Sequence, residues 1–203
     1  ANYIEFVLEK NYKPTSVFSF AKHCNFEEAQ FYNYFGTFDA LENAIFSHFF
    51  KHTIEILHKS EEFATFDARN KLLSFYFTFF EILTANRSYV VHALKGDLKK
   101  LKALQNLKND FKNFTDSLEI EKIDIKNQHI EKVQEKALQE SAWLQLLVTL
   151  KFWLDDSSPS FEKTDIFIEK SVNASFDLMD IKPVKSIIDF GKFVLKEKLN
   201  FHS

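Results

Sequence analysis

Apolar residues at the start of the chain recur at helical spacing. Ile4, Val7 and Leu8 fall on one side of a helix, because positions three and four residues apart share a helix face. Asn11 and the turn around Pro14 follow directly. The pattern therefore predicts a short first helix that ends near Asn11.

Two more short helices are predicted before Gly36. Ser16 has a side-chain oxygen that can cap the second helix, and Asn25 is placed to end it. A third helix is predicted over residues 27–34, and Gly36 ends it. The inward-facing residues of the second helix are expected to be Val17, Phe20 and Ala21.

Longer helices are predicted in the remainder of the chain. Thr37 is placed to cap a fourth helix that runs to about residue 60. Residues 67–86 leave hardly any polar face and predict a buried helix. The polar turn over residues 155–160 is the clearest break in the second half. Further helices are expected over 88–95, 97–118, a long segment that ends at 154, 162–179 and 183–199.

The composition supports an all-α fold. The 203 residues include only three Gly and three Pro, too few for the turns of an all-β sandwich or barrel. The single cysteine, Cys24, excludes an intramolecular disulfide and fits a reducing compartment. No signal-peptide pattern opens the chain and no apolar run is long enough to span a bilayer, so we expect a cytoplasmic location.

Phenylalanine is unusually frequent, with 25 residues, whereas arginine occurs only at positions 69 and 87. An AT-rich coding sequence favours Phe and Lys over Arg and accounts for both observations. A cavity lined by aromatic side chains is the other explanation, and composition does not distinguish the two.

The sequence contains no pattern typical of an enzyme. It lacks a nucleophile–base motif, a Gly-rich phosphate loop and a paired-carboxylate signature, so we expect neither catalysis nor a cofactor. His48, His52 and Glu55 share one helical stripe, a spacing that can hold a metal ion. Two histidines four residues apart also occur easily by chance, and we predict no metal site.

Residues 14–41 combine a short capped helix, a turn and an aromatic run at the end of the next helix. The positions concerned are Val17, Phe20, Ala21, the run from Phe31 through Tyr32, Asn33 and Tyr34 to Phe35, and then Thr37, Asp39 and Leu41. This segment resembles the DNA-binding domain of the TetR family of transcriptional regulators, whose members carry a run of the form T-S/T-V-x-x-I-A, a turn, and then an aromatic ending to the recognition helix.

The resemblance implies an all-α, TetR-like architecture of nine to ten helices. Residues 1–46 would form a helix-turn-helix unit of three helices, and residues 47–203 a helical ligand-binding and dimerisation domain. Two such units in a homodimer would bind a pseudo-palindromic operator in double-stranded DNA. A small apolar effector would shift the spacing of the units.

The resemblance also suggests three groups of site residues. Tyr32 and Tyr34 match family positions that often contact phosphates, and packing in the core of the three-helix unit is the other interpretation of these two residues. The full set of candidate DNA contacts is Lys13, Thr15, Ser16, Lys22, Gln30, Tyr32, Asn33 and Tyr34. The candidate effector pocket consists of Phe75, Phe79, Leu83, Leu104, Phe111 and Trp143. The candidate dimer interface consists of Leu147, Leu150, Trp153, Phe167, Val172 and Phe176, for which an internal core helix is the other interpretation.

Local charge points to a second hypothesis. Glu27 and Glu28 open the predicted recognition helix, and Phe38 stands where the family often has Lys. Residues 1–50 carry three lysines against six carboxylates, whereas phosphate binding requires cations.

The second hypothesis is a TetR-fold protein that has lost DNA binding. It would bind lipid or isoprenoid-like molecules at a membrane surface, because residues 183–201 form a basic amphipathic segment. A TetR-like fold with such a helix also resembles the lipid-binding accessory protein of mitochondrial ubiquinone synthesis. Packing of this segment on its own domain is the other interpretation.

Overall fold

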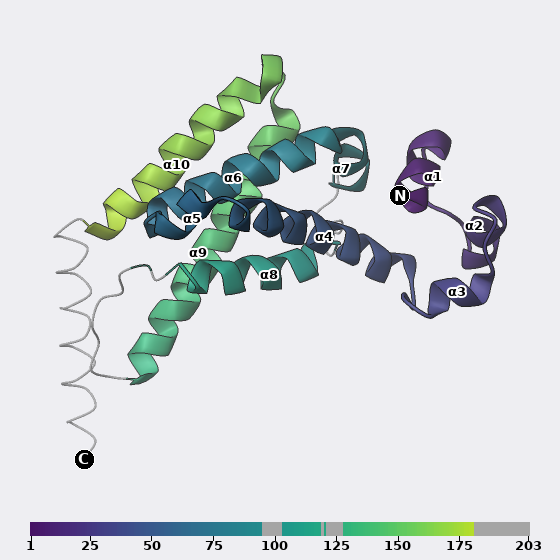
Figure 1. The fold of residues 1–203 in the computed structure, drawn as a ribbon, viewed down its shortest axis with the longest axis horizontal. Helices are drawn as coiled ribbons and strands as arrows, with labels where there is room; N and C mark the ends of the chain where they lie inside the picture. Colours follow the sequence, from purple (N-terminus) through teal and green to yellow (C-terminus); the bar gives the residue numbers. More distant parts are fainter. Residues whose placement is uncertain (95–102, 119, 121–127, 181–203) are drawn as a thin grey trace. The chain divides into compact units, whose positions relative to one another are not determined.

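The computed structural model describes residues 1–94, 103–118, 120 and 128–180. This part of the chain contains ten α-helices and no strand, which confirms the all-α prediction. Figure 1 labels these helices along the chain. The helices are α1 (Asn2–Lys10), α2 (Val17–His23), α3 (Glu28–Tyr32), α4 (Phe38–His58), α5 (Glu61–Thr65), α6 (Ala68–Ala85), α7 (Arg87–Leu94), α8 (Gln105–Asp116), α9 (Gln128–Asp155) and α10 (Glu162–Asp180), with a 3₁₀ turn, η2 (Pro159–Phe161), before α10.

The chain divides into two compact units. The first comprises Ala1–Thr65 and Ser74–Ser117, and the second comprises Phe66–Leu73 and Leu118–Ser203. Helix α6 contributes its first turns to the second unit and the rest to the first. The boundary predicted at residue 46 falls inside α4, which continues unbroken to His58.

In the first unit, α4 and α8 form the most extensive helix pair, and α1 lies against α7 (Figure 1). The α4–α8 pair is fixed by polar contacts as well as by packing. The Asn43 side-chain oxygen accepts hydrogen bonds from the backbone N–H groups of Gln105, at 3.0 Å, and Asn106, at 3.3 Å. Because the first N–H groups of a helix have no partner within it, Asn43 caps α8 from a neighbouring helix.

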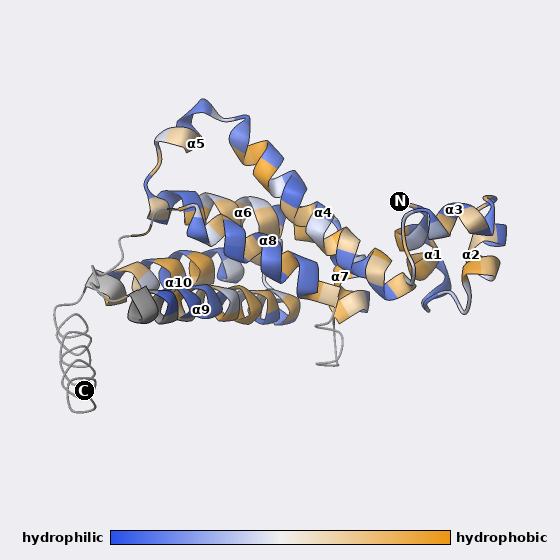
Figure 2. Cartoon of the chain, turned by 90° about the horizontal axis from the view of Figure 1, so that it is seen from below, coloured by the Kyte–Doolittle hydropathy of each residue, from blue (hydrophilic) through white to orange (hydrophobic). Residues whose placement is uncertain are grey.

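In the second unit, α9 and α10 pack as an antiparallel pair with orange, hydrophobic residues along both helices (Figure 2). Asp156, in the turn between them, accepts hydrogen bonds from the backbone and hydroxyl groups of Ser158 and Thr164 at 2.7–3.0 Å. Burial raises the pKa of this carboxyl, but these four hydrogen bonds outweigh it and lower the pKa of Asp156 to about 2. Asp156 thus joins the turn to the start of α10.

The predicted helices agree with the observed ones except in detail. The third helix was predicted over 27–34 but spans Glu28–Tyr32, because Glu27 is its cap. Helix α5 was not predicted, since five residues are too short to establish a period. The helix predicted over 183–199 lies outside the described residues.

Candidate functional site

Helices α2 and α3 and the turn between them occupy the segment for which the sequence predicts a helix-turn-helix, and Ser16 caps α2 as predicted. The Ser16 hydroxyl oxygen accepts a hydrogen bond from the Ser19 N–H at 3.1 Å and caps α2. Asn25, in the turn, has a φ of 55° in the left-handed region. Asparagine tolerates this conformation better than most residues, so the turn forms without a glycine.

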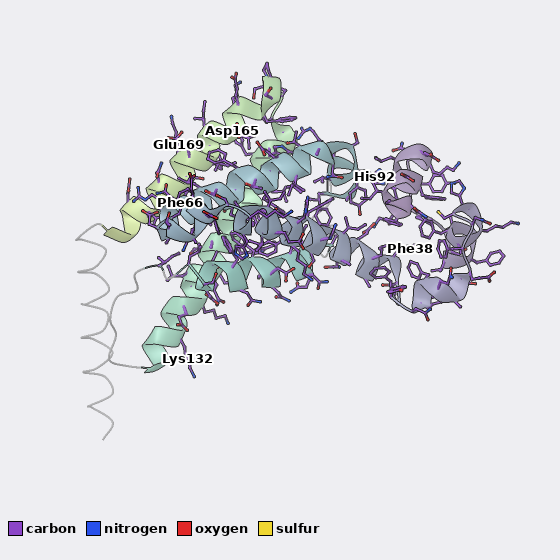
Figure 3. The ribbon with its side chains drawn as sticks, viewed as in Figure 1. Phe38, Phe66, His92, Lys132, Asp165 and Glu169 are labelled. Atoms are coloured by element: carbon purple, nitrogen blue, oxygen red, sulfur yellow. The ribbon has the colours of Figure 1, made fainter. Side chains whose placement is uncertain are left out.

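Aromatic side chains form the core beneath the helix-turn-helix. The Phe20 ring lies edge-on to the rings of Tyr3, at 5.8 Å, and Phe38, at 5.7 Å. Phe38, which is labelled in Figure 3, also stacks on Tyr3 at 5.6 Å and meets Phe31 at 5.2 Å. At the position where the sequence resemblance leads us to expect a Lys, Phe38 therefore adds a ring to the core. The loss of a cation there has a structural reason.

Five of the eight candidate DNA-contacting residues already have partners within the unit. The Lys13 ammonium donates to Glu42 at 2.7 Å. The Gln30 side-chain oxygen accepts from the Glu27 N–H at 3.2 Å, which completes the cap of α3. The other contacts join the Thr15 and Ser19 hydroxyls, Ser16 to Ser19, and the Tyr32 hydroxyl to the Glu28 carboxylate.

The remaining three candidates are exposed. Lys22 lies at the end of α2, and Asn33 and Tyr34 follow α3. The Tyr34 side chain is 80% exposed. Lys22, Asn33 and Tyr34 therefore present a cation, an amide and a phenol to solvent around the helix-turn-helix, groups that commonly bind phosphate oxygens.

A second cluster of aromatic rings fills the interior of the first unit between α4, α6 and α8. Phe75 lies 5.3 Å from Phe79 and 5.3 Å from Phe111 between ring centroids. Leu83 and Leu104, also predicted for the effector pocket, are fully buried in the same unit. Trp143 is buried on α9 and belongs to the second unit. Five of the six predicted residues thus share one unit.

Tyr76 introduces a polar group into this apolar interior. Its side chain is fully buried, and its hydroxyl has no hydrogen-bond partner among the described residues. Its ring stacks on Phe80 at 6.2 Å and lies edge-on to Phe75 at 6.0 Å. Burial raises the pKa of Tyr76, which stays a neutral donor. Leaving a buried hydroxyl unpaired costs about 1–3 kcal/mol.

The α9–α10 pair has an inner and an outer apolar face. Leu150, Trp153 and Val172, predicted at the dimer interface, are buried. Phe167 stacks on Phe152 at 4.6 Å. Leu147 and Phe176 are half-buried, and the Arg69 guanidinium lies 5.4 Å above the Phe176 ring.

The outer face carries apolar residues that the sequence argument did not select. Leu144, Val148 and Phe152 recur every four residues along α9, and Ile166 lies on α10. Leu144 is 60% exposed and Ile166 is 50% exposed. An open groove of about 450 Å³ lies beside Phe152 and Ile166, and its other lining residues are Lys163, Phe167, Lys170 and Ser171. We call Leu144, Val148, Phe152 and Ile166 the outer stripe.

A family model described as "Tetracyclin repressor-like, C-terminal domain" matches residues 71–194, which is more than half of the chain. The chain belongs to the tetracyclin repressor-like family. The match includes most of α6, all of α7 to α10, and further residues up to 194. No curated protein matches the sequence. This tetracyclin repressor-like chain is thus a member of a family of regulators.

The helix-turn-helix precedes the matched region, so its function depends on its own geometry. No group of histidine, cysteine and carboxylate side chains in the described part of this tetracyclin repressor-like chain has the arrangement of a metal site, and His48 and His52 stack 6.3 Å apart. None of the helices that the structure describes is long and apolar enough to cross a membrane.

Among the buried residues of the first unit that carry polar groups, sequence reasoning missed Glu42, Tyr76 and Tyr89. Glu42 offered a signal, because it precedes Phe46 by four residues on the apolar stripe of α4. The tyrosines offered none, since a buried Tyr and a buried Phe produce the same periodicity.

Proposed function

We propose that this protein is a homodimeric transcriptional regulator that binds double-stranded DNA through the helix-turn-helix and releases it when an apolar effector binds. The observation that carries the proposal is the capped α2–α3 pair, with its turn at Asn25, in a chain of the tetracyclin repressor-like family. A regulator needs such a unit on an effector-binding helical domain.

The exposed groups around α3 support a particular mode of DNA binding. Lys22 would neutralise one phosphate, and Asn33 and Tyr34 would donate hydrogen bonds to phosphate oxygens. To bind a base edge, the Gln30 side chain would have to release the hydrogen bond that it accepts from the Glu27 N–H, and this loss would weaken the cap of α3. Glu27 and Glu28 oppose the duplex electrostatically. We therefore expect weak, strongly salt-dependent affinity.

The aromatic interior supports an apolar effector that carries one hydrogen-bond acceptor. Phe75, Phe79 and Phe111 provide apolar ring faces and edges, and the Tyr76 hydroxyl is an unpaired buried donor. A carbonyl or ether oxygen placed at Tyr76 would remove the cost of burying that hydroxyl alone. Aromatic or other ring-containing molecules with one such oxygen fit this chemistry best.

The outer stripe supports a homodimer. Leu144, Val148 and Phe152 form one line on α9, and Ile166 continues the apolar surface onto α10. Such residues are costly to leave in water, and a second copy of the same face would cover them in a symmetric interface.

The DNA-binding part is tested by fluorescence anisotropy with the intergenic DNA beside the protein's own gene, over a salt series. We expect saturable binding that exceeds binding to random DNA and weakens steeply with salt. Lys22→Ala should reduce the salt slope by about two, because it removes one phosphate contact from each protomer of the dimer, whereas Lys163→Ala on α10 should leave the slope unchanged. Equal affinity for intergenic and random DNA at low salt would contradict the proposal.

The effector part is tested by extracting the purified protein with organic solvent and identifying co-purified molecules by mass spectrometry. We expect an apolar molecule with an oxygen acceptor, and Tyr76→Phe should retain it about two- to tenfold less well. Unchanged retention would remove Tyr76 from the effector site.

A further inference from the structure

Glu42 is a buried carboxylate at the point where three segments of the first unit meet. It lies on α4 and is only 5% exposed. The Tyr3 hydroxyl, from α1, donates to its Oε1 at 2.6 Å, and the Lys13 ammonium, from the α1–α2 connection, donates to its Oε2 at 2.7 Å. A buried carboxylate is stable only with such partners. Glu42 therefore holds α1 and the start of the helix-turn-helix on α4.

Tyr89 places a second phenol beside this contact. It lies on α7, is 1% exposed, and its hydroxyl has no hydrogen-bond partner among the described residues. Its ring lies edge-on to the Tyr3 ring at 6.5 Å and tilted against Phe46 at 6.2 Å. Burial, and after it the charge of Glu42, raise the pKa of Tyr89, so the carboxylate acts electrostatically on this ring.

We propose that Tyr3 and Tyr89 compete for the Glu42 carboxylate, so that Glu42 switches between holding α1 and holding α7. In the structure Tyr3 has the contact and Tyr89 lacks a partner. In the second state the Tyr89 hydroxyl donates to Glu42, and Tyr3 releases α1.

The exchange is close to balanced in free energy. One phenol–carboxylate hydrogen bond breaks and an equivalent one forms, while Lys13 continues to neutralise the charge from Oε2. In each state one of the two phenols lacks a hydrogen-bond partner, so the free-energy cost of an unpaired hydroxyl is the same in both states. A small displacement of α7 relative to α4 is then enough to reverse the preference.

The exchange connects α7, in the domain proposed to bind the effector, to α1, in the unit proposed to bind DNA. Tyr89 lies within the matched family domain, whereas Tyr3 lies on the first helix of the helix-turn-helix unit. Release of Tyr3 leaves α1 without its hydrogen bond to α4. The effect on DNA affinity rests on the proposed function, but the exchange of partners does not.

A double-mutant cycle in urea denaturation of the full chain tests the exchange. Tyr3→Phe alone should change the unfolding equilibrium constant little, because Tyr89 replaces the lost donor. In a Tyr89→Phe background the same substitution leaves Glu42 with no phenol donor and should raise that constant about tenfold or more, because the folded state loses stability. Tyr12→Phe, at an exposed tyrosine, should have no effect in either background. An equal effect of Tyr3→Phe in both backgrounds would overturn the proposal.

A spectroscopic measurement tests the exchange even if the double variant Tyr3→Phe, Tyr89→Phe does not fold. In protein labelled with ¹³C at the tyrosine ζ carbon, Tyr3→Phe should move the Tyr89 signal downfield as its hydroxyl begins to donate to a carboxylate. In the Glu42→Gln, Tyr3→Phe variant this displacement should be absent. A Tyr89 signal that does not respond to loss of Tyr3 would overturn the exchange.

DNA binding separates this inference from the proposed function. Tyr89→Phe favours the state in which Tyr3 holds α1 on α4 and should strengthen DNA affinity a few-fold. Tyr3→Phe favours the state in which Tyr89 donates to Glu42 and should weaken DNA affinity. Coupling in the cycle with no DNA binding by the wild type supports the exchange and contradicts the proposed function. Normal DNA binding by the wild type, with no coupling in the cycle, supports the proposed function and contradicts the exchange.

Discussion

The Gln30 side chain accepts a hydrogen bond from the backbone N–H of Glu27, so the residue that we propose to read a base also caps its own helix. Glu27 completes the same capping box from the other side. This arrangement stabilises a helix of only five residues and gives the acidic start of α3 a structural reason. Folding and DNA binding therefore make opposite demands on Glu27.

The conflict at Glu27 leads to a substitution that separates charge from capping. Glu27→Ser keeps an N-cap oxygen and removes the charge, and Glu28→Gln removes the second charge. The double variant should bind DNA about tenfold more tightly at low salt, as measured by anisotropy, because two repulsive carboxylates are lost. Glu61→Ser with Glu62→Gln, at the exposed start of α5, should leave affinity unchanged. Unaltered affinity in the first variant would mean that α3 does not face the duplex.

The sequence specified helix ends more reliably than side-chain roles. The Ser16 and Thr37 caps were predicted and are confirmed, because N-capping is a local interaction between residues three apart. Phe38 is different: sequence reasoning treated it as a lost DNA-binding cation, and the structure packs it against Tyr3 and Phe31. That role depends on α1, which lies far from Phe38 in the sequence, so no local pattern contains it.

Helix α9 shows a second limit of sequence reasoning. Apolar residues occur on most sides of its C-terminal half, so periodicity does not determine which side faces the interior. The predicted dimer residues Leu150 and Trp153 lie inside, whereas Leu144 and Val148 lie outside. The direction of burial depends on where α10 packs, which is a tertiary property.

The capping of α8 by Asn43 should be a measurable part of the stability. Asn43→Ala removes the acceptor for two backbone N–H groups and should lower the free energy of unfolding by about 1–2 kcal/mol in urea denaturation. Asn43→Asp keeps the acceptor and should retain most of the stability. The matched control is Asn113→Ala, at an exposed position of α8 itself. Equal losses for Asn43→Ala and Asn113→Ala would show that the cap contributes nothing.

Asp156 should make stability depend on pH in the acid range. Its pKa is lowered from 3.8 to about 2 in the folded protein, so its contribution is fully present above about pH 4. The contribution is lost as the pH falls through the folded pKa, and it is on the order of 2 kcal/mol.

The check is the difference in unfolding free energy between wild type and Asp156→Asn at several pH values. The variant should be less stable at pH 7, and the difference should shrink as the pH approaches 2. Asn113→Ala, at an exposed position of α8, removes no titratable group and should show no comparable pH dependence. A constant difference from pH 7 to pH 2 would contradict the assignment of the acid sensitivity to Asp156.

The outer stripe should determine the oligomeric state. Val148→Glu places a charge in the middle of an apolar line between Leu144 and Phe152, and burying it against a second copy would leave the charge unpaired. We expect the variant to dissociate at concentrations at least 100-fold higher than the wild type in sedimentation equilibrium. Ile56→Glu, at an exposed apolar position on α4, should not alter the association constant. A wild-type protein that is monomeric at high micromolar concentration, or a Val148→Glu variant that remains dimeric, would exclude this face as the interface.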